Sequence, residues 1–571
     1  MIRTTSASTG AIIALAAFGG ALSALALPNE LFLYGSPAIG LIALVPLYLA
    51  MRRSRSYGAA ALAAAVFGML AHGLSSYWLW FFKDFRFWTL GTTTLAYALL
   101  YALAGLYLRL AARDGGRLAP LAFALVWTSW EHLKSIGFLG YPWGLIAYSW
   151  NSVLPFIQLS AVTGVPGLSF LIAYANGALG NLVEFLGPPP PLAGLPACGP
   201  GDGTEPAPAR FLRVFRARVA GLPCELRIRA ERRAMAAGHL ALVAMLGSLA
   251  LAYGSVRLAA PLRETARIRA ALIQQNTDSW TSGELATLKT IARLTREVLE
   301  ENPDGFDLVV WSETSLARPW DDFAAFYERT PREDPLGPLV RSSGAWTFTG
   351  APDILDYETY EASNSVSLID PSGRLVAQYA KTHPVPFAEA IPFWEVDWFR
   401  AFIQETVGLA SGWVMGTELT IFELPLRDGT LVRFGAPICF EDAFASLNRD
   451  FVLKGADFLL NLTNDSWSLT DSSEIQHFVA ARFRAIETGR TLVRSTNSGV
   501  SAVVDPRGRV LDSFPLFVEE ARAVDIPVYS GGAPTPYLAF GDWFAGLALF
   551  LSGLLALILG IQEPLPRRKH A

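Results

Sequence analysis

The sequence predicts a bundle of membrane-spanning helices joined to a layered α/β domain, and three observations carry this prediction. First, 52% of the 571 residues are hydrophobic, 17% are charged and the mean hydropathy is +0.33, whereas a soluble protein carries roughly 25% charged residues. Second, the excess apolarity lies in the first 260 residues and the last 40. Third, the stretch from about 265 to 530 has charges throughout and is long enough to bury a large core.

Eight apolar runs are long enough to cross the roughly 30 Å of a bilayer's hydrocarbon. They lie at about 10–27, 36–51, 57–82, 90–112, 117–135, 157–186, 237–260 and 537–561. The first run also has features of a cleaved signal peptide, since Arg3 precedes it and small residues stand at Ala24 and Ala26. We expect it to be retained, because further spans follow directly.

Arginine and lysine concentrate in alternate connections between these runs, which predicts the orientation of the chain. The positive connections hold Arg52, Arg53 and Arg55; Arg113 and Arg117; eight arginines between 210 and 233; and the tail after 561. With eight spans all of these fall on one side, so we expect that side to be cytoplasmic. The predicted division is a bundle at 1–263 with a cytoplasmic linker at about 187–235, an extracytoplasmic domain at 264–530, and a last span with a basic tail at 531–571.

The three cysteines, Cys198, Cys224 and Cys439, lack metal-ligand spacing and cannot form a disulfide framework. In the predicted topology the first two lie in the cytoplasmic connection, where thiols stay reduced. Cys439 is then alone in the extracytoplasmic domain. A buried, inert cysteine is common, but a free thiol in an oxidising compartment is a liability, which favours a chemical role.

Short β-rich runs alternate with helical stretches between 264 and 530, which predicts a layered α/β domain. Helical periodicity marks Gly283–Glu300 and Gln476–Thr488. The predicted strands are 268–273, 306–311, 345–350, 365–369, 376–379, 432–438, 458–461, 491–495 and 501–504. Turns are expected at 370–373 and 505–508, where Asp-Pro is followed by Gly.

Polar side chains follow three of these strands, at the points where the strands end. Glu313 follows the strand that ends at Trp311, Cys439 and Glu441 follow another, and Asn464 follows a third. Ligands bind in the crevice outside the carboxyl ends of strands in layered α/β folds. Each of these residues alone is more often structural or solvated, so the functional prediction rests on the group, with Lys381 added.

A cysteine, a carboxylate and a lysine together can carry out acyl transfer. The carboxylate takes the thiol proton, and the lysine stabilises both the thiolate and the oxyanion of a tetrahedral intermediate. The N–H of Phe440 is a candidate second oxyanion donor. A Cys–His pair is the alternative, and His383 and His477 are the histidines of this domain. There is no Gly-x-Ser-x-Gly elbow and no His-Glu-x-x-His or Cys-x-x-Cys, which argues against a serine hydrolase and a zinc site.

Three motifs resemble the Glu-Lys-Cys motifs of the nitrilase superfamily. They are Val-Val-Trp-Ser-Glu-Thr (309–314), Tyr-Ala-Lys-Thr-His-Pro-Val-Pro-Phe-Ala-Glu (379–389) and Pro-Ile-Cys-Phe-Glu-Asp (437–442). Joined to eight predicted spans, the pattern is similar to the bacterial apolipoprotein N-acyltransferase family, as are Gly-Tyr-Pro-Trp at 140–143 and Arg-Ser-Thr-Asn-Ser-Gly at 494–499.

The resemblance implies an αββα sandwich on a helical bundle in the bacterial inner membrane, with the sandwich on the periplasmic side. It implies transfer of an acyl chain from a phospholipid to the α-amino group of a lipoprotein's diacylglyceryl-cysteine through a thioester, without a cofactor or metal. By motif position, Glu313 is the base, Lys381 the oxyanion stabiliser and Cys439 the nucleophile. The supporting or substrate-binding residues it implies are Glu389, Glu441, Phe440, Trp280, Trp467 and Asn464.

The sequence departs from the family's pattern at Phe440, where tyrosine is frequent, at Phe-Ala-Glu (387–389), and in the loop after Trp467. Two alternatives remain. A membrane-tethered nitrilase-like amidase would share the three catalytic residues but would not need eight spans. A membrane scaffold or transporter is disfavoured because few charges lie within the predicted spans, His72 and Glu131 being the main candidates.

Overall fold

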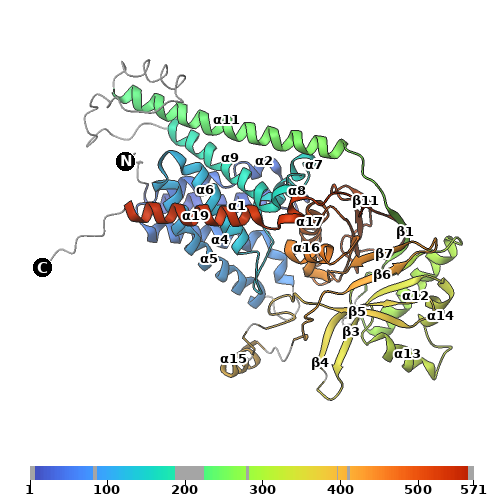
Figure 1. Ribbon diagram of the computed structural model, residues 1–571. Coiled ribbons are helices and arrows are strands. Elements are labelled where there is room, and N and C mark those ends of the chain that lie inside the picture. Colours follow the sequence, from blue (N-terminus) through green and yellow to red (C-terminus); the bar gives the residue numbers. More distant parts are fainter. Residues whose placement is uncertain are drawn as a thin grey trace.

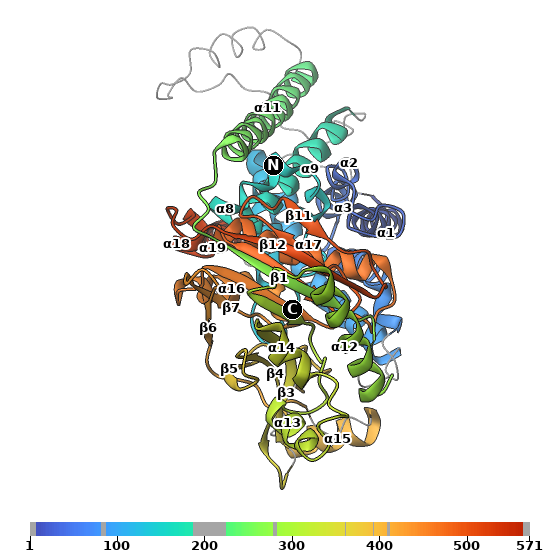
Figure 2. The same ribbon diagram turned by 90° about the vertical axis from the view of Figure 1, so that its right-hand side faces the viewer.

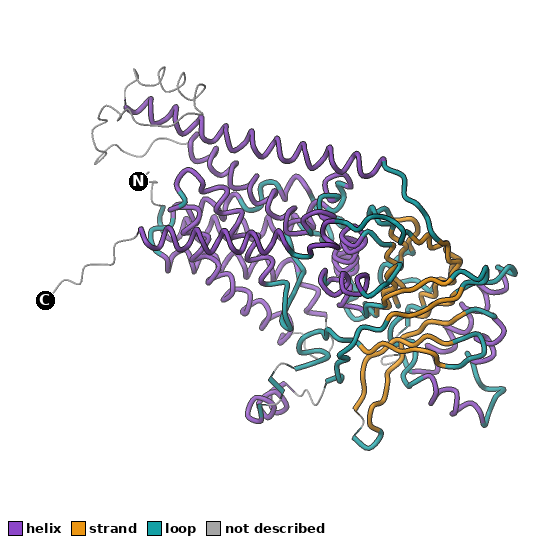
Figure 3. The backbone as a smooth tube through the Cα atoms, viewed as in Figure 1, coloured by secondary structure: helices purple, strands orange, loops and turns teal. Residues whose placement is uncertain are grey.

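The computed structural model describes residues 7–81, 87–186, 224–277, 282–359, 361–391, 393–394, 396–407 and 412–562. Helices gather at one end of the molecule and the strands at the other (Figures 1 and 3). Most of the linker predicted at about 187–235 and all of the tail after Gln562 lie outside the described residues, as do Cys198 and Trp280.

The helical end is a bundle in which long helices pack closely. Its main helices are α1 (Thr9–Ala26), α3 (Val45–Arg53), α4 (Tyr57–Ser75), α5 (Thr93–Arg109), α6 (Ala119–Leu133), α9 (Val165–Leu186), α11 (Cys224–Ala259) and α19 (Trp543–Gln562). Short helices α2 (Pro37–Gly40), α7 (Leu154–Ile157), α8 (Ser160–Thr163) and α18 (Pro536–Phe540) lie between them. Helix α11 runs along the outside of the bundle (Figure 1).

Glycines allow the closest helix contacts, as in other membrane bundles. A Cβ atom at Gly20 of α1 would lie 2.6 Å from the carbonyl oxygen of Phe67 on α4. A Cβ atom at Gly68 of α4 would lie 2.4 Å from the ring of Tyr101 on α5. The backbones of α1 and α4 therefore touch, and the Tyr101 ring of α5 packs directly on the backbone of α4.

Within the described part of the chain, four helices have the length and apolarity to cross a membrane: Thr9–Ala26, Tyr57–Ser75, Trp88–Asp114 and Ala230–Ala259. The pair Leu154–Thr163 and Val165–Leu186, bent by 120°, makes a fifth if it counts as one span. Helix α6 and the apolar segment Trp543–Leu559 are shorter. The apolar helices indicate a membrane protein, but the count of eight is not confirmed. The run predicted at 36–51 forms two short helices, α2 and α3, each with a proline in its first turn.

The other end contains two mixed six-stranded sheets. The first has the order β12-β1-β2-β3-β4-β5 and the second β11-β10-β9-β8-β7-β6. The first sheet comprises β1 (Ala266–Gln274), β2 (Leu308–Trp311), β3 (Trp346–Asp356), β4 (Glu361–Ile369), β5 (Leu375–Ala380) and β12 (Glu520–Val528). The second comprises β6 (Ile421–Pro425), β7 (Leu431–Gly435), β8 (Phe458–Thr463), β9 (Thr491–Thr496), β10 (Ala502–Val504) and β11 (Val510–Ser513).

The two sheets face each other, and helices cover their outer faces (Figure 2). Phe348 on β3 packs edge-on against Phe422 on β6 and Phe434 on β7, with ring centroids 5.1 and 5.0 Å away. Helices α12 (Glu284–Glu301), α13 (Trp320–Glu328) and α14 (Gly337–Ser343) pack beside the first sheet. Helices α16 (Ala445–Leu453) and α17 (Asp471–Thr488) pack on the second. Helix α15 (Asp397–Val407) stands apart from both sheets (Figure 1).

The predicted strands all occur, with shifted ends. Strand β3 continues to Asp356 through Pro352, a residue that normally argues against a strand interior. The strand predicted at 432–438 ends at Gly435, and Ile438 forms an isolated bridge with Leu462. Strands β6, β11 and β12 were not predicted.

Candidate active site

Glu313 lies directly after β2, and its carboxylate is held by two groups from other strands. Its Oε1 accepts a hydrogen bond from the Asn364 side chain at 2.8 Å, and its Oε2 accepts one from the Asn464 backbone N–H at 2.7 Å. The side chain is buried. Gly350 on β3 permits this position, because a Cβ atom there would lie 2.6 Å from the Cα of Glu313. The carboxylate is therefore fixed in orientation.

Lys381 follows β5 and is completely buried. Its Nζ donates to Glu389 Oε1 at 2.8 Å and lies 3.9 Å from Glu313 Oε1. Glu389 Oε1 also accepts from Asn364, and its Oε2 accepts from the Val385 N–H at 2.7 Å. The lysine is thus placed between two carboxylates, which is compatible with a buried ammonium.

Cys439 is the first residue of a 3₁₀ turn, Cys439–Ala443, and has a φ of +48°. A left-handed conformation is uncommon for residues other than glycine, and such strain concentrates at functional sites. The Asn461 side chain on β8 donates to the carbonyl oxygens of Pro437 at 2.9 Å and Cys439 at 3.2 Å. These contacts hold the turn that carries the thiol.

Glu441 connects the cysteine turn to the lysine loop. Its Oε1 accepts from the Thr382 N–H at 2.8 Å, the Thr382 hydroxyl at 3.0 Å and the His383 N–H at 2.9 Å. Its Oε2 accepts from the Ile438 N–H at 2.8 Å, and the Tyr379 hydroxyl lies within 3.0 Å of both oxygens. The residue is fully buried, so it acts as a clamp between the two loops.

The electrostatic environment assigns protonation states to these groups. Burial raises the pKa of Glu313, against the opposing effect of Lys381. Burial and then the charge of Glu313 raise the pKa of the Cys439 thiol well above its ordinary value, although Lys381 opposes them. Burial lowers the pKa of Lys381, but Glu389, Cys439 and Glu313 outweigh it and raise it. The resting site therefore has a charged lysine, a protonated thiol and a carboxylate with increased proton affinity.

His383 is not arranged as a catalytic base. Burial and then the charge of Lys381 lower its pKa to about 4, so the ring is neutral at pH 7. The ring packs on Phe444 with centroids 3.9 Å apart, and its Nε2 is buried without a hydrogen-bond partner among the described residues. These contacts favour Glu313 over His383 as the base.

A buried group of four charged side chains lies behind the cysteine turn. His477 Nδ1 and Asp465 Oδ1 are 2.9 Å apart, and His477 Nε2 lies 2.9 Å from Asp442 Oδ1. Arg494 approaches Asp442 at 3.2 Å and Asp465 at 3.4 Å. Burial lowers the pKa of His477, but Asp442 and Asp465 outweigh it and raise it to about 10. The group has two positive and two negative charges, and it joins the cysteine turn to the residue beside Asn464.

Helix α17 connects this region to the bundle. The Gln476 side chain donates to the carbonyl oxygens of Pro28 at 2.8 Å and Ser75 at 2.9 Å, and accepts from the Trp78 indole at 3.1 Å. Gln476 precedes His477, so adjacent residues contact the bundle and the charged group. Trp467 also packs against Trp78, with ring centroids 5.4 Å apart.

Phe440 contacts the bundle directly. Its ring stacks on Trp143, with centroids 5.2 Å apart and an interplanar angle of 13°. A cavity of about 450 Å³ lies beside this stack, lined in part by Glu131, Thr382, His383 and Phe444. Its volume is within the range of small-molecule sites.

The structure therefore brings together seven of the nine predicted site residues, whereas Trp467 packs against Trp78 of the bundle and Trp280 lies outside the described residues. Sequence reasoning missed Asn364, Thr382, Tyr379, Asp442 and Asp465. One feature of the sequence could have pointed to Asn364, because the polar run Ser-Asn-Ser interrupts a strand that is otherwise mostly apolar and is buried in the fold. Among the described residues, no group of three or more His, Cys, Asp and Glu side chains has the arrangement of a metal site.

Two family models match the chain. The model of the apolipoprotein N-acyltransferase N-terminal domain matches residues 19–178, and that of the carbon-nitrogen hydrolases matches residues 269–531. "Apolipoprotein N-acyltransferase 2" of Treponema denticola is 36% identical over 518 residues, which cover 90% of this chain and 91% of the relative. The chain belongs to the apolipoprotein N-acyltransferase family.

Other members of the apolipoprotein N-acyltransferase family match over similar lengths. "Apolipoprotein N-acyltransferase 2" of Treponema pallidum is 33% identical, with 96% of this chain and 94% of the relative covered. Among solved structures, Nit3 of Saccharomyces cerevisiae, of the nitrilase superfamily, matches 47% of this chain and 91% of its own, with 20% identity and a TM-score of 0.34. The chain is an acyltransferase with a carbon-nitrogen hydrolase domain and an N-terminal membrane domain.

Proposed function

We propose that this acyltransferase moves an acyl chain from a membrane phospholipid to the N-terminal α-amino group of diacylglyceryl-cysteine lipoproteins, through a thioester on Cys439. One observation carries the proposal: the Glu313–Lys381–Cys439 group lies in a domain joined through Gln476 and Phe440 to an apolar helical bundle. Donor and acceptor are both anchored in the bilayer, so an enzyme built on such a bundle meets them by lateral diffusion.

In the first step Glu313 takes the proton of the thiol, and the sulfur attacks the carbonyl carbon of a phospholipid ester. The oxyanion forms near the ammonium of Lys381, with the Phe440 N–H as a second candidate donor. The C–O bond then breaks, and Glu313 returns the proton to the leaving alkoxide. A lysophospholipid departs and an acyl thioester remains on Cys439.

In the second step the acceptor amine attacks the thioester carbonyl. Glu313 accepts a proton from the nitrogen, the C–S bond breaks, and the thiolate is protonated again. The amide product is N-acylated, and the site returns to its starting state. Asn364 and Asn464 keep Glu313 in one orientation through both steps.

The proposed location is a bacterial inner membrane, with both termini cytoplasmic and the catalytic domain on the periplasmic side. The grouping of arginine-bearing connections supports this orientation. Arg113 donates to the carbonyl oxygen of Ser54, Arg52 pairs with Glu184, and Arg232 lies over the ring of Phe185. These connections thus meet at one end of the bundle.

Thiol labelling of intact cells tests the orientation. An impermeant reagent should leave Cys198 and Cys224 unmodified. Modification of either from outside would overturn the topology. The result for Cys439 does not change this conclusion, because a shielded thiol can fail to react on either side.

Complementation tests the reaction. A strain depleted of its own lipoprotein N-acyltransferase should grow with the wild-type chain and not with Cys439→Ala, and mass spectrometry should find an acylated lipoprotein N-terminus. An amidase is the second candidate, since carbon-nitrogen hydrolase domains are not restricted to acyl transfer. Ammonia release from soluble amides, with no acylated lipoprotein, would favour the amidase.

A further inference from the structure

Four arginines gather where α11 meets the catalytic domain. Arg257 lies in the last turn of α11, Arg482 on α17, and Arg507 and Arg509 in the turn between β10 and β11. Arg257 donates to the carbonyl oxygens of Gln158 and Ile486, each at 3.4 Å. The Gln158 side chain donates to the Arg507 carbonyl at 2.8 Å, so Arg257 and Arg507 are held next to each other.

The other two arginines complete the cluster. Arg482 donates to the Gly508 carbonyl at 2.6 Å, and Arg509 to the Leu258 carbonyl at 2.6 Å. These contacts fix where the guanidinium groups lie but do not neutralise their charge.

The cluster has more positive than negative charge. Asp505 is its paired carboxylate, 3.6 Å from Arg509, which leaves three of the four positive charges uncompensated. Glu264, farther along the chain, pairs instead with Arg267 at 2.8 Å. The guanidinium of Arg507 makes no hydrogen bond to another described residue, and its Nε is buried. Arg257 and Arg507 also repel each other. Asp505 also attracts Arg257 and Arg507, so the cluster shares this one carboxylate, and the two adjacent guanidinium groups keep enough positive charge to bind a further anion.

The position of Arg257 along α11 places this cluster at the level of lipid headgroups. Twenty-three residues without Asp, Glu, Lys or Arg separate Arg233 from Arg257. At 1.5 Å per residue they span about 35 Å, which slightly exceeds the roughly 30 Å of hydrocarbon and falls short of the 40–45 Å that includes the headgroups. Arg257 therefore lies about 18 Å from the middle of the bilayer, within the headgroup layer.

The surface beside the cluster is suited to acyl chains. Only 11% of the apolar window of α11 is buried within the chain. Tyr253, one turn before Arg257, is 38% exposed, and Val256, the residue next to Arg257, is 71% exposed. A lipid with its phosphate at the arginines would lay its chains along this face.

We propose that Arg257 and Arg507, with Arg482 and Arg509 behind them, bind the phosphate of a phospholipid that lies against α11 and is not the acyl donor. This lipid would hold the catalytic domain against the membrane. The arginines that bind it come both from α11 of the bundle and from α17 and the β10–β11 turn of the catalytic domain.

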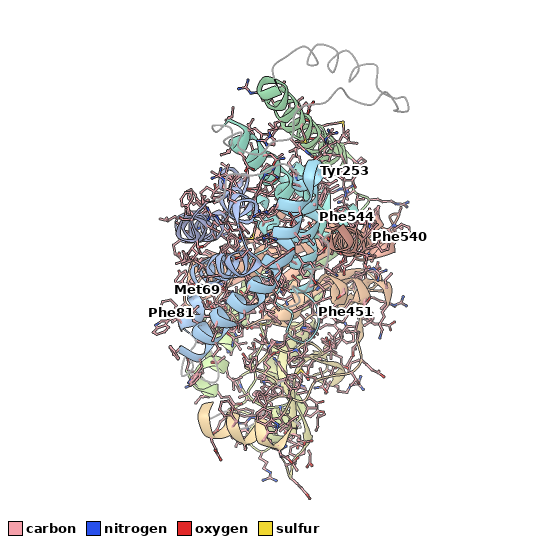
Figure 4. The ribbon with its side chains drawn as sticks, turned by 90° about the vertical axis from the view of Figure 1, so that its left-hand side faces the viewer. Met69, Phe81, Tyr253, Phe451, Phe540 and Phe544 are labelled. Atoms are coloured by element: carbon pink, nitrogen blue, oxygen red, sulfur yellow. The ribbon has the colours of Figure 1, made fainter. Side chains whose placement is uncertain are left out.

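The site is separate from the catalytic residues. On α17, Ile486 follows His477 by nine residues, which places the two about 180° apart around the helix. His477 faces the cysteine turn, whereas the Ile486 carbonyl faces Arg257. In Figure 4, Tyr253 of α11 lies toward one side of the bundle, and Phe81, which ends the short helix that carries Trp78, lies toward the other.

Titration of the full-length protein in detergent with short-chain phosphatidylglycerol, followed by native mass spectrometry, tests the proposal. Each arginine near an anionic headgroup accounts for roughly a fivefold change in binding. Arg507→Gln should therefore weaken binding about fivefold, and Arg257→Gln/Arg507→Gln about 25-fold. The matched control is Arg374→Gln, an arginine on the catalytic domain with an 82% exposed side chain. Diacylglycerol, which has no phosphate, should not bind this site.

Unchanged lipid binding in Arg507→Gln would overturn the proposal, and this variant remains informative if the double variant is unstable. Equal weakening in Arg374→Gln would also overturn it, because the effect would then be general charge. Inorganic phosphate that binds as tightly as the lipid would show a free-anion site instead. Acyl-enzyme formation on Cys439 should keep its wild-type rate in Arg507→Gln, whereas a loss parallel to lipid binding would identify the lipid as the donor.

Discussion

Glu441→Gln is the substitution with the most direct consequence, because five hydrogen-bond donors surround this carboxylate. A glutamine can keep its oxygen toward Thr382 and His383. Its amide group then faces the Ile438 N–H, so that two donors oppose each other. The Tyr379 hydroxyl can turn and accept, but the Ile438 N–H has lost its acceptor.

The cost follows from this one contact. A hydrogen bond to a charged group contributes about 1.5–3 kcal/mol, and a buried N–H without a partner costs about 1–3 kcal/mol. Both figures describe the loss of the same contact, so we expect a decrease of roughly 1.5–3 kcal/mol in the free energy of unfolding. Because Ile438 precedes Cys439, the turn should move, and the rate of acyl-enzyme formation should fall at least tenfold.

Chemical denaturation in detergent measures the stability, and mass spectrometry of the acylated protein measures the rate. Glu423→Gln is the control, since Glu423 forms an exposed pair with Arg433 and such pairs contribute about 0–1 kcal/mol. If Glu441→Gln unfolds within about 1 kcal/mol of wild type and acylates normally, the clamp described here is wrong.

Three further predictions concern the catalytic group. Lys381→Ala and Lys381→Arg should both lose most activity, because the buried ammonium between Glu313 and Glu389 has no room for a planar guanidinium; near-normal turnover of Lys381→Ala would disprove its role. With phospholipid but no acceptor, wild-type enzyme should accumulate one acyl chain on Cys439 that neutral hydroxylamine removes and diacylated lipopeptide discharges; turnover without any adduct would contradict the thioester. His477 has a folded-state pKa raised to about 10 from an ordinary 6.5, so the stability it contributes is fully present below pH 6.5 and lost as the pH rises through 10. The difference in stability between wild type and His477→Gln should therefore shrink between pH 7 and 10.5, and a constant difference would show that the imidazole is not charged.

The positions of the candidate catalytic residues could be predicted from the sequence because of where their strands end. Glu313, Lys381 and Cys439 each follow a strand or its extension, and strand ends can be located from apolar runs and turn residues. Strands β11 and β12 were missed because exposed and charged residues dilute their patterns, and Pro527 lies within β12. These strands are fixed by their partners, such as the pairing of β12 with β1.

The support around the catalytic residues could not be predicted in the same way. Asn364 and Glu313, which are hydrogen-bonded, lie 51 positions apart in the sequence, and the paired residues His477 and Asp442 lie 35 positions apart. Nothing local distinguishes such residues from ordinary buried polar ones. Likewise, hydropathy alone joined residues 36–51 into one run, whereas Pro37 and Pro46 begin separate helices there.

The contacts of α17 have a practical consequence for anyone who wishes to study the catalytic half alone. A fragment of residues 264–530 would retain both sheets and the cysteine turn, but it would leave the three partners of Gln476 behind. It would also expose the face of Phe440 that Trp143 covers. Such a fragment should aggregate or misplace its nucleophile, so the soluble-looking half and the membrane half form one inseparable working unit.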